Sequence, residues 1–153
     1  MILTIDSTNK ENIRNMAEKP YITADQAATA IQTILTEANN PFVKQIAVAI
    51  VDDAGLMVAY YQMDNVRLYA RRHAFRKAYT AAIMGMDTSV NGDQLKERGR
   101  TVSDYGDPNL TPGEGGVVVL SKSGVIMGGI GVGGYIERDE ELAALGLKSM
   151  NIE

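Results

Sequence analysis

Two β-hairpins separated by a helical segment constrain the fold of this chain more than any other feature. One pair of β-rich runs spans Ile46 to Val51 and Leu56 to Gln62, and a second pair spans Val117 to Ser121 and Val125 to Val132. Each pair is joined by a short turn, which connects antiparallel strands, because parallel neighbours need a crossover of about a dozen residues. With helical patterns before, between and after the hairpins, this order predicts an α+β fold in which helices flank an antiparallel sheet.

Three segments have the residue spacing of helices. The first begins at a capping box of Thr23 and Gln26 and continues with apolar residues at helical spacing, namely Ala27, Ala30, Ile31, Ile34 and Leu35. The second, Leu68 to Met86, has a stripe of small residues that would let it lie close to a sheet: Ala70, Ala74, Ala78 and Ala82. The third runs from about Arg138 to Leu145.

The segment from Gly99 to Gly116 is rich in Gly, Pro, Asp and Asn and has no helical or strand period. It is predicted to be a long loop, and loops longer than about 12 to 15 residues are often functional. One alternative is that it closes over a ligand, with Tyr105 in contact and the glycine-rich residues 112–116 offering backbone N–H groups to an anion. The other alternative is a contact with a second subunit.

Residues 1–20 are interpreted as an N-terminal extension, with a capping-box pattern at Thr8 and Glu11, and residues 21–153 as one domain. A net charge of −4 without a long basic run gives no footprint for nucleic acid, and no segment indicates a membrane partner. The apolar start lacks the charged region of a signal peptide, so a cytoplasmic location is expected. Because the chain has no cysteine, disulfides and thiolate chemistry are excluded.

Gly129, Gly131 and Gly134 form a G-x-G-x-x-G pattern, which is typical of a dinucleotide-binding loop. Such a loop opens a strand–helix–strand unit with an acidic residue about 20 positions further on. With the sequence ending at Glu153, we expect no second strand after the last helix and therefore no dinucleotide site. Glycine within a strand instead indicates a bulge or close approach by a ligand or another backbone, as expected for Gly129 and Gly131.

The central helix carries the most informative chemistry, in the stretch ARRHAFRKAYT. His73 and Lys77 share one helix face, and Arg72, Arg76 and Tyr79 lie on the adjacent face. His73 is the only histidine, and imidazole is both the usual axial haem ligand and a general base near neutral pH. The alternative is structural, with the arginines solvated or paired with carboxylates of another subunit and the histidine binding nothing.

Three carboxylates, Asp139, Glu140 and Glu141, open the last helix, where the helix dipole favours negative charge. Asp139 or Glu140 could also face Lys77 and contribute to a ligand site. Without clustered histidines, we expect no metal site built from typical ligands.

Several stretches in order resemble the GlcG/HbpS-like family, which includes haem-binding protein S, GlcG and the C-terminal domain of PduO. The matching stretches are ITADQAATAI, AVAIVDDAGLMVAYYQMD, RKAYTAA, GVIMGGIGVGG and RDEELAALGL, which together span Ile22 to Leu147. Lys77 matches a lysine of the family, and the glycines resemble the end of a family strand rather than a nucleotide loop. The order and spacing of these stretches make the resemblance specific.

The resemblance implies a profilin-like fold in one domain, assembly into tetramers or octamers, and a pocket between the sheet and the helices. It implies haem or corrinoid-related ligands for some members and a place in catabolic operons for others. This sequence departs from the family pattern at Gly133, at Tyr135 and in its basic central helix. These departures lie near the expected pocket and leave room for a different ligand.

Two functions of different classes are expected. The first is an oligomeric cytoplasmic pocket protein that binds a small anionic or planar ligand, with haem as the candidate cofactor, through Arg72, Arg76, Tyr79, Tyr105, Gly129, Gly131 and Asp139. The second is a cofactor-independent enzyme, such as a lyase or isomerase acting on a small carboxylate or aromatic acid in a catabolic pathway. In that enzyme His73 would transfer a proton, and Lys77 and Arg76 would hold the carboxylate. A weaker third alternative is a structural or regulatory partner.

Overall fold

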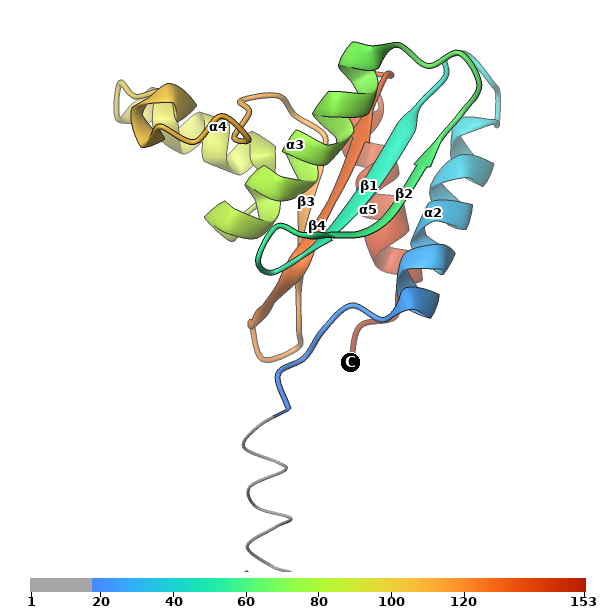
Figure 1. Ribbon diagram of the computed structural model, residues 1–153, viewed down its shortest axis with the longest axis horizontal. Coiled ribbons are helices and arrows are strands. Elements are labelled where there is room, and N and C mark those ends of the chain that lie inside the picture. The colour runs from blue at the N-terminus through green and yellow to red at the C-terminus, as the bar shows by residue number, and fades with distance from the viewer. Residues whose placement is uncertain (1–17) are drawn as a thin grey trace, which may run out of the picture.

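A four-stranded antiparallel sheet with the strand order β2-β1-β4-β3 forms the centre of the fold (Figure 1). The structure is a computed structural model that describes residues 18–153. β1 (Ala47–Asp52) and β2 (Met57–Gln62) form the first predicted hairpin, and β3 (Gly116–Leu120) and β4 (Ile126–Gly133) form the second. β1 pairs antiparallel with β4 and joins the two hairpins, which confirms the predicted α+β, profilin-like fold.

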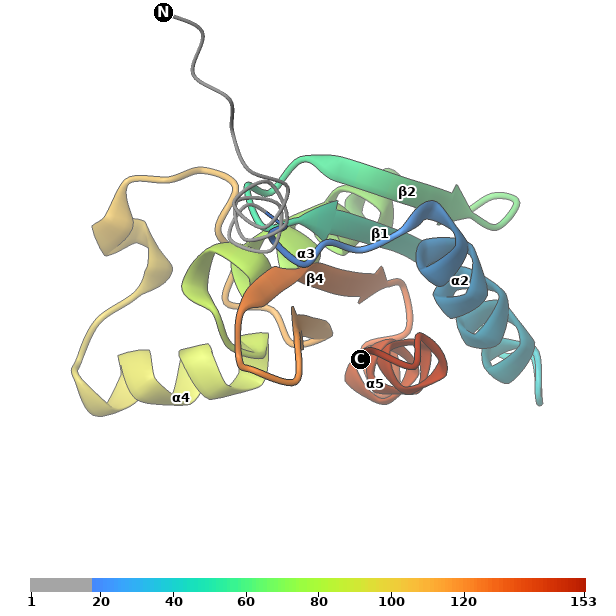
Figure 2. The ribbon, with the colours of Figure 1, turned by 90° about the horizontal axis from the view of Figure 1, so that it is seen from below.

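Helices cover both faces of the sheet (Figures 1 and 2). α2 (Ala24–Ala38) and α5 (Asp139–Ser149) pack against each other on one face, over a core of fully buried residues that includes Ile34, Ile50 and Leu142. α3 (Leu68–Met84) covers the other face and buries its alanines there. The central strands β1 and β4 are thus enclosed between two helical layers, whereas the edge strand β2 is largely exposed.

The ends of the helices follow from local chemistry. The predicted capping box of α2 is confirmed, because the Gln26 N–H donates to the Thr23 hydroxyl at 3.1 Å and the Thr23 N–H donates to the Gln26 side chain at 2.9 Å. α3 ends at Met84, two residues earlier than predicted, because Gly85 adopts a left-handed conformation with φ of 68°.

The backbone of α3 lies directly on β4, as the stripe of small residues predicts. A Cβ atom added at Gly131 would lie only 2.0 Å from the carbonyl oxygen of Ala74. Every second residue of β4 repeats this close contact one helical turn away, in the pairs Gly129 with Ala78 and Gly133 with Ala70. Two residues of a strand and four residues of a helix both advance by about 6 to 7 Å, so the two backbones stay in step.

Helix α4 (Thr88–Glu97) has no counterpart among the predicted elements. Its sequence contains Asn, Gly and Asp, which are poor helix formers. Two hydrogen bonds from β3 stabilise the first turn of α4. The Thr88 hydroxyl accepts the N–H of Gly116 at 3.0 Å, and the Asp87 carboxylate accepts the N–H of Val118 at 2.9 Å. These tertiary contacts are invisible to a search for helical periodicity.

The predicted long loop from Gly99 to Gly116 is mostly irregular but contains a short 3-10 helix, η1 (Val102–Tyr105). The Thr101 N–H donates to the Asp104 carboxylate at 2.9 Å and helps to fix the start of η1. α4 and η1 extend to one side of the sheet, away from α2 (Figures 1 and 2).

The capping-box pattern at Thr8 and Glu11 lies outside the described residues. None of the helices within residues 18–153 combines the length and the apolar character that a bilayer span requires.

Replacing Gly131 with alanine tests the contact between α3 and β4. The added methyl group would overlap the carbonyl oxygen of Ala74, so we expect a loss of roughly 1–3 kcal/mol or more in the free energy of unfolding, measured by urea denaturation. Gly92→Ala is the matched control, because its Cβ would have 4.0 Å of clearance within α4 and should stabilise the protein by about 0.5–1 kcal/mol. Equal stability of the Gly131 variant and the wild type would contradict the close contact.

Candidate functional site

A cavity of about 430 Å³ opens beside α3, between the residues that precede β3 and the end of β4. We call it the His73 cavity. Among its lining residues are His73, Arg76 and Lys77 from α3, and Asp139 from the start of α5. The fold therefore brings together four residues that the sequence singled out from two separate segments.

Lys77 and Asp139 form a buried ion pair in the wall of this cavity, with side chains that are 7% and 2% exposed. Lys77 Nζ donates to Asp139 Oδ2 at 2.8 Å and to the carbonyl oxygen of Val132 at 3.0 Å. The second carboxylate oxygen of Asp139 accepts the N–H of Tyr135 at 2.9 Å. Burial raises the pKa of Asp139, and the Lys77 ammonium acts in the opposite direction. The pair thus ties α3 to α5 and to the end of β4.

His73 lies half-buried one turn before Lys77 on α3. Its Nδ1 atom is 3.5 Å from the hydroxyl of Thr111, and the Tyr69 ring packs against the imidazole with a centroid distance of 4.1 Å. Burial lowers the pKa of His73 below its ordinary value of 6.5, and the positive charges of Arg76 and Lys77 lower this pKa further. The imidazole is therefore mainly neutral at pH 7, the form that accepts a proton or binds a metal.

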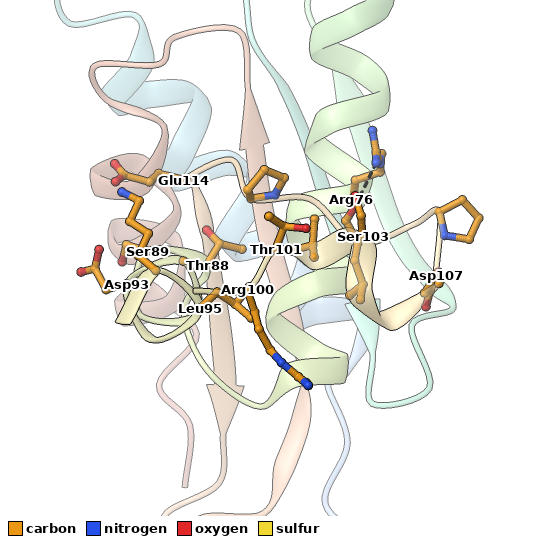
Figure 3. A pocket seen from close by; sticks show the side chains of 17 residues that line it. Arg76, Thr88, Ser89, Asp93, Leu95, Arg100, Thr101, Ser103, Asp107 and Glu114 are labelled. Atoms are coloured by element: carbon orange, nitrogen blue, oxygen red, sulfur yellow. Dashed lines mark hydrogen bonds between the residues drawn. The ribbon is translucent and has the colours of Figure 1, made fainter. Parts of the chain in front are cut away.

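Arg76 lies between several cavities. It lines the His73 cavity, a groove on the opposite flank of α3, and a larger cavity of about 700 Å³ beside α4, shown in Figure 3. One Nη nitrogen donates to the carbonyl oxygen of Leu110 at 2.8 Å. The cavity beside α4 is lined by hydroxyl groups such as those of Thr88, Thr101 and Ser103 but contains no imidazole. The acid–base chemistry expected from the sequence is therefore concentrated in the His73 cavity.

The other predicted ligand contacts lie elsewhere. Arg72 is exposed and does not line the His73 cavity, and the Tyr79 hydroxyl donates to Asp107 at 2.7 Å. Tyr105 is 43% exposed on η1, outside this cavity. The two glycines named as ligand contacts, Gly129 and Gly131, lie against the backbone of α3 and are not among the residues that line the His73 cavity.

Several residues of the cavity were not singled out from the sequence, among them Tyr69, Thr111 and Ile136. Tyr69 precedes His73 by four positions on the same helix, so helical spacing could have found it. Thr111 and Ile136 lie in irregular segments, for which the sequence has no period to indicate a direction.

The pKa of His73 can be measured on its own, because the chain has one histidine. We expect an NMR titration of its ring protons to have a midpoint below 6.5. Arg76→Gln should raise this midpoint by removing one nearby positive charge, whereas Arg72→Gln, a matched change on the exposed side of α3, should have a smaller effect. A wild-type midpoint at or above 6.5 would show that burial and charge do not control this imidazole.

The ion pair can be tested with one single and one double variant. Lys77→Met leaves the buried Asp139 carboxylate without its cation, so we expect a loss of about 3–5 kcal/mol in the free energy of unfolding. Lys77→Met combined with Asp139→Asn removes both charges and keeps an oxygen for the Tyr135 N–H, so it should be more stable than the single variant. Chemical denaturation that ranks the double variant below the single variant would contradict this account.

The chain is similar in sequence to one protein family and in structure to several solved proteins. The sequence model of the family described as haem degrading protein HbpS-like matches residues 22–148. No curated protein matches the chain in sequence. The match to the family covers most of the chain and includes every residue of the ion pair and the imidazole.

Three solved structures illustrate the similarity of fold. A double mutant of HbpS from Streptomyces reticuli is 23% identical, with 97% of this chain and 94% of that chain covered and a TM-score of 0.77. A second structure of HbpS is 25% identical, with coverages of 86% and 92% and a TM-score of 0.76. A complex of PduOC with haem is 21% identical, with coverages of 88% and 98% and a TM-score of 0.76. On the sequence match and the shared fold together, the chain belongs to the HbpS-like family.

Proposed function

We propose that the His73 cavity binds a small anionic or planar ligand, and that haem is the first ligand to test. The observation that carries this proposal is a half-buried imidazole with a lowered pKa in a cavity that several cations also line. Its volume of about 430 Å³ lies within the usual range of roughly 300–1,000 Å³ for small-molecule sites. A neutral imidazole is what an axial haem ligand requires.

The lining of the cavity fits the parts of a haem molecule. Tyr69 and Ile136 are 72% and 76% exposed, so they offer apolar surface at an open mouth to a flat ring. Lys44 and Arg67 also line the cavity and could pair with propionate groups. Bound haem would supply the chemistry of its iron, and the residues of this chain would bind and orient it.

The relatives support haem as the first candidate. One solved relative is PduOC in complex with haem, and the family model is named for haem degradation. Haem binding and haem degradation are properties of those proteins. We propose haem binding for this chain because it shares their fold and has the imidazole described above. The departures in the basic helix leave a different planar anion as the alternative ligand.

A cofactor-independent enzyme is the second candidate function. The supporting observation is again the neutral imidazole of His73, which could transfer a proton to or from a small carboxylate substrate in a catabolic pathway. Because Asp139 and Val132 already take two hydrogen bonds from Lys77, Arg76 is the better placed of the two cations to hold the substrate carboxylate. Lys77 would then shape the cavity and lower the pKa of His73.

We also propose a cytoplasmic homo-oligomer, a tetramer or octamer. Support comes from the exposed apolar side chains of the edge strand β2, where Met57, Val58 and Tyr61 are 37–47% exposed. An uncovered apolar edge strand tends to pair with another chain. Self-association would cover this surface without requiring a different partner.

Haem titration of the purified protein tests the leading function. We expect a saturable, stoichiometric shift of the Soret band that His73→Ala abolishes, because the imidazole–iron bond sets the spectrum. Tyr105→Phe is the control and should keep the shift, since Tyr105 lies outside the His73 cavity. A shift that survives His73→Ala but is lost in Tyr105→Phe would move the haem to η1. No shift in the wild-type protein would favour the enzyme.

A further inference from the structure

A separate groove of about 370 Å³ lies between β2 and the flank of α3 opposite to His73. We call it the arginine groove, because Arg71, Arg72 and Arg76 line it together with Tyr60, Leu68 and Phe75. None of the residues between positions 18 and 153 that line it carries a carboxylate. Three positive charges thus face one groove without an acidic group in its wall.

Two arginines that line this groove each have a buried nitrogen atom without a hydrogen-bond partner among the described residues. The Nε atoms of Arg71 and Arg76 are buried, and neither has an acceptor within residues 18–153. The Arg76 guanidinium is held in place by its hydrogen bond to the carbonyl oxygen of Leu110 at 2.8 Å. Buried donors in folded proteins are nearly always paired, and a guanidinium matches the geometry of a carboxylate or phosphate. The groove therefore brings together two guanidinium groups that each have an unused donor, the kind of group that binds an oxyanion.

The rest of the wall is apolar and aromatic. Leu68 and Tyr60 are 53% and 39% exposed, and Phe75 packs against Tyr79 with a ring-centroid distance of 5.8 Å. Such a wall favours a flat apolar body beside the anion. Inorganic phosphate could satisfy the arginines but would leave this surface uncovered.

We propose that the arginine groove binds a small planar carboxylate, whose oxygens contact Arg71 and Arg76 and whose apolar body lies against Tyr60, Leu68 and Phe75. This site is distinct from the His73 cavity. The two lie on different flanks of α3, and of the described residues Arg76 alone lines both. Binding in the groove therefore needs neither haem nor the imidazole.

Isothermal titration with benzoate, inorganic phosphate and benzamide tests the groove in the intact protein. We expect benzoate to bind more tightly than phosphate, and benzamide, which has the shape of benzoate without its charge, to bind about tenfold more weakly or worse. Arg71→Gln should weaken benzoate binding by about tenfold or more. Arg98→Gln is the matched control, because Arg98 is exposed at the end of α4 and lines neither site. His73→Ala should keep the benzoate affinity of the wild type.

Several outcomes would overturn this assignment. They are the absence of benzoate binding to the wild type, equal binding of benzamide or phosphate, and loss of binding in His73→Ala with retention in Arg71→Gln. Sedimentation provides one more test, since dissociation of an oligomer by Arg71→Gln would show that a carboxylate of another subunit fills the groove. If Arg71→Gln does not fold, Arg71→Lys keeps the charge without the guanidinium and should still weaken benzoate binding.

Discussion

The direct contact between the backbones of α3 and β4 is the constraint on which the rest of the structure depends. Glycines on the strand and alanines on the helix leave no side chain larger than a methyl group between the two elements. A Cβ atom added at Gly131 would lie only 2.0 Å from the carbonyl oxygen of Ala74. Because interiors are close-packed, a helix seated this closely cannot slide or roll without breaking many contacts at once. The directions of all the remaining side chains on α3 are consequently fixed relative to the sheet.

This fixed helix explains how one element borders two separate cavities. Its alanine stripe faces the sheet, one flank presents His73 and Lys77, and the other presents Arg71 and Phe75. Arg76 lies between the flanks and borders both. The ion pair between Lys77 and Asp139 links the same helix to the first residue of α5. Packing, charge and ligand access are thus divided among different faces of a single helix.

The sequence predicted those parts of the fold that have local chemical causes. The two hairpins followed from short turns, α2 from its capping box, and the seat of α3 from its alanine spacing. Helix α4 could not be predicted, because hydrogen bonds from β3 stabilise a segment with poor helix propensity.

The candidate site likewise combines features that local sequence predicts with features that depend on tertiary structure. His73 and Lys77 share a face because helical geometry alone requires it, and Asp139 does meet Lys77. Thr111 comes to the cavity from an irregular segment, and no spacing rule gives its direction. The glycines of the G-x-G-x-x-G pattern were expected to allow close approach by another backbone, and Gly129 and Gly131 do lie against the backbone of α3.

The close packing of α3 on β4 also makes this protein a practical scaffold for redesign. The residues that hold the helix in place are alanines and glycines, whereas the α3 residues that line the arginine groove are Leu68, Arg71, Arg72, Phe75 and Arg76. A library that varies positions 71, 72 and 75 alone would change the chemistry of one recognition surface while the helix retains its depth and register. New binding specificities could be selected there against a backbone that does not have to be redesigned each time.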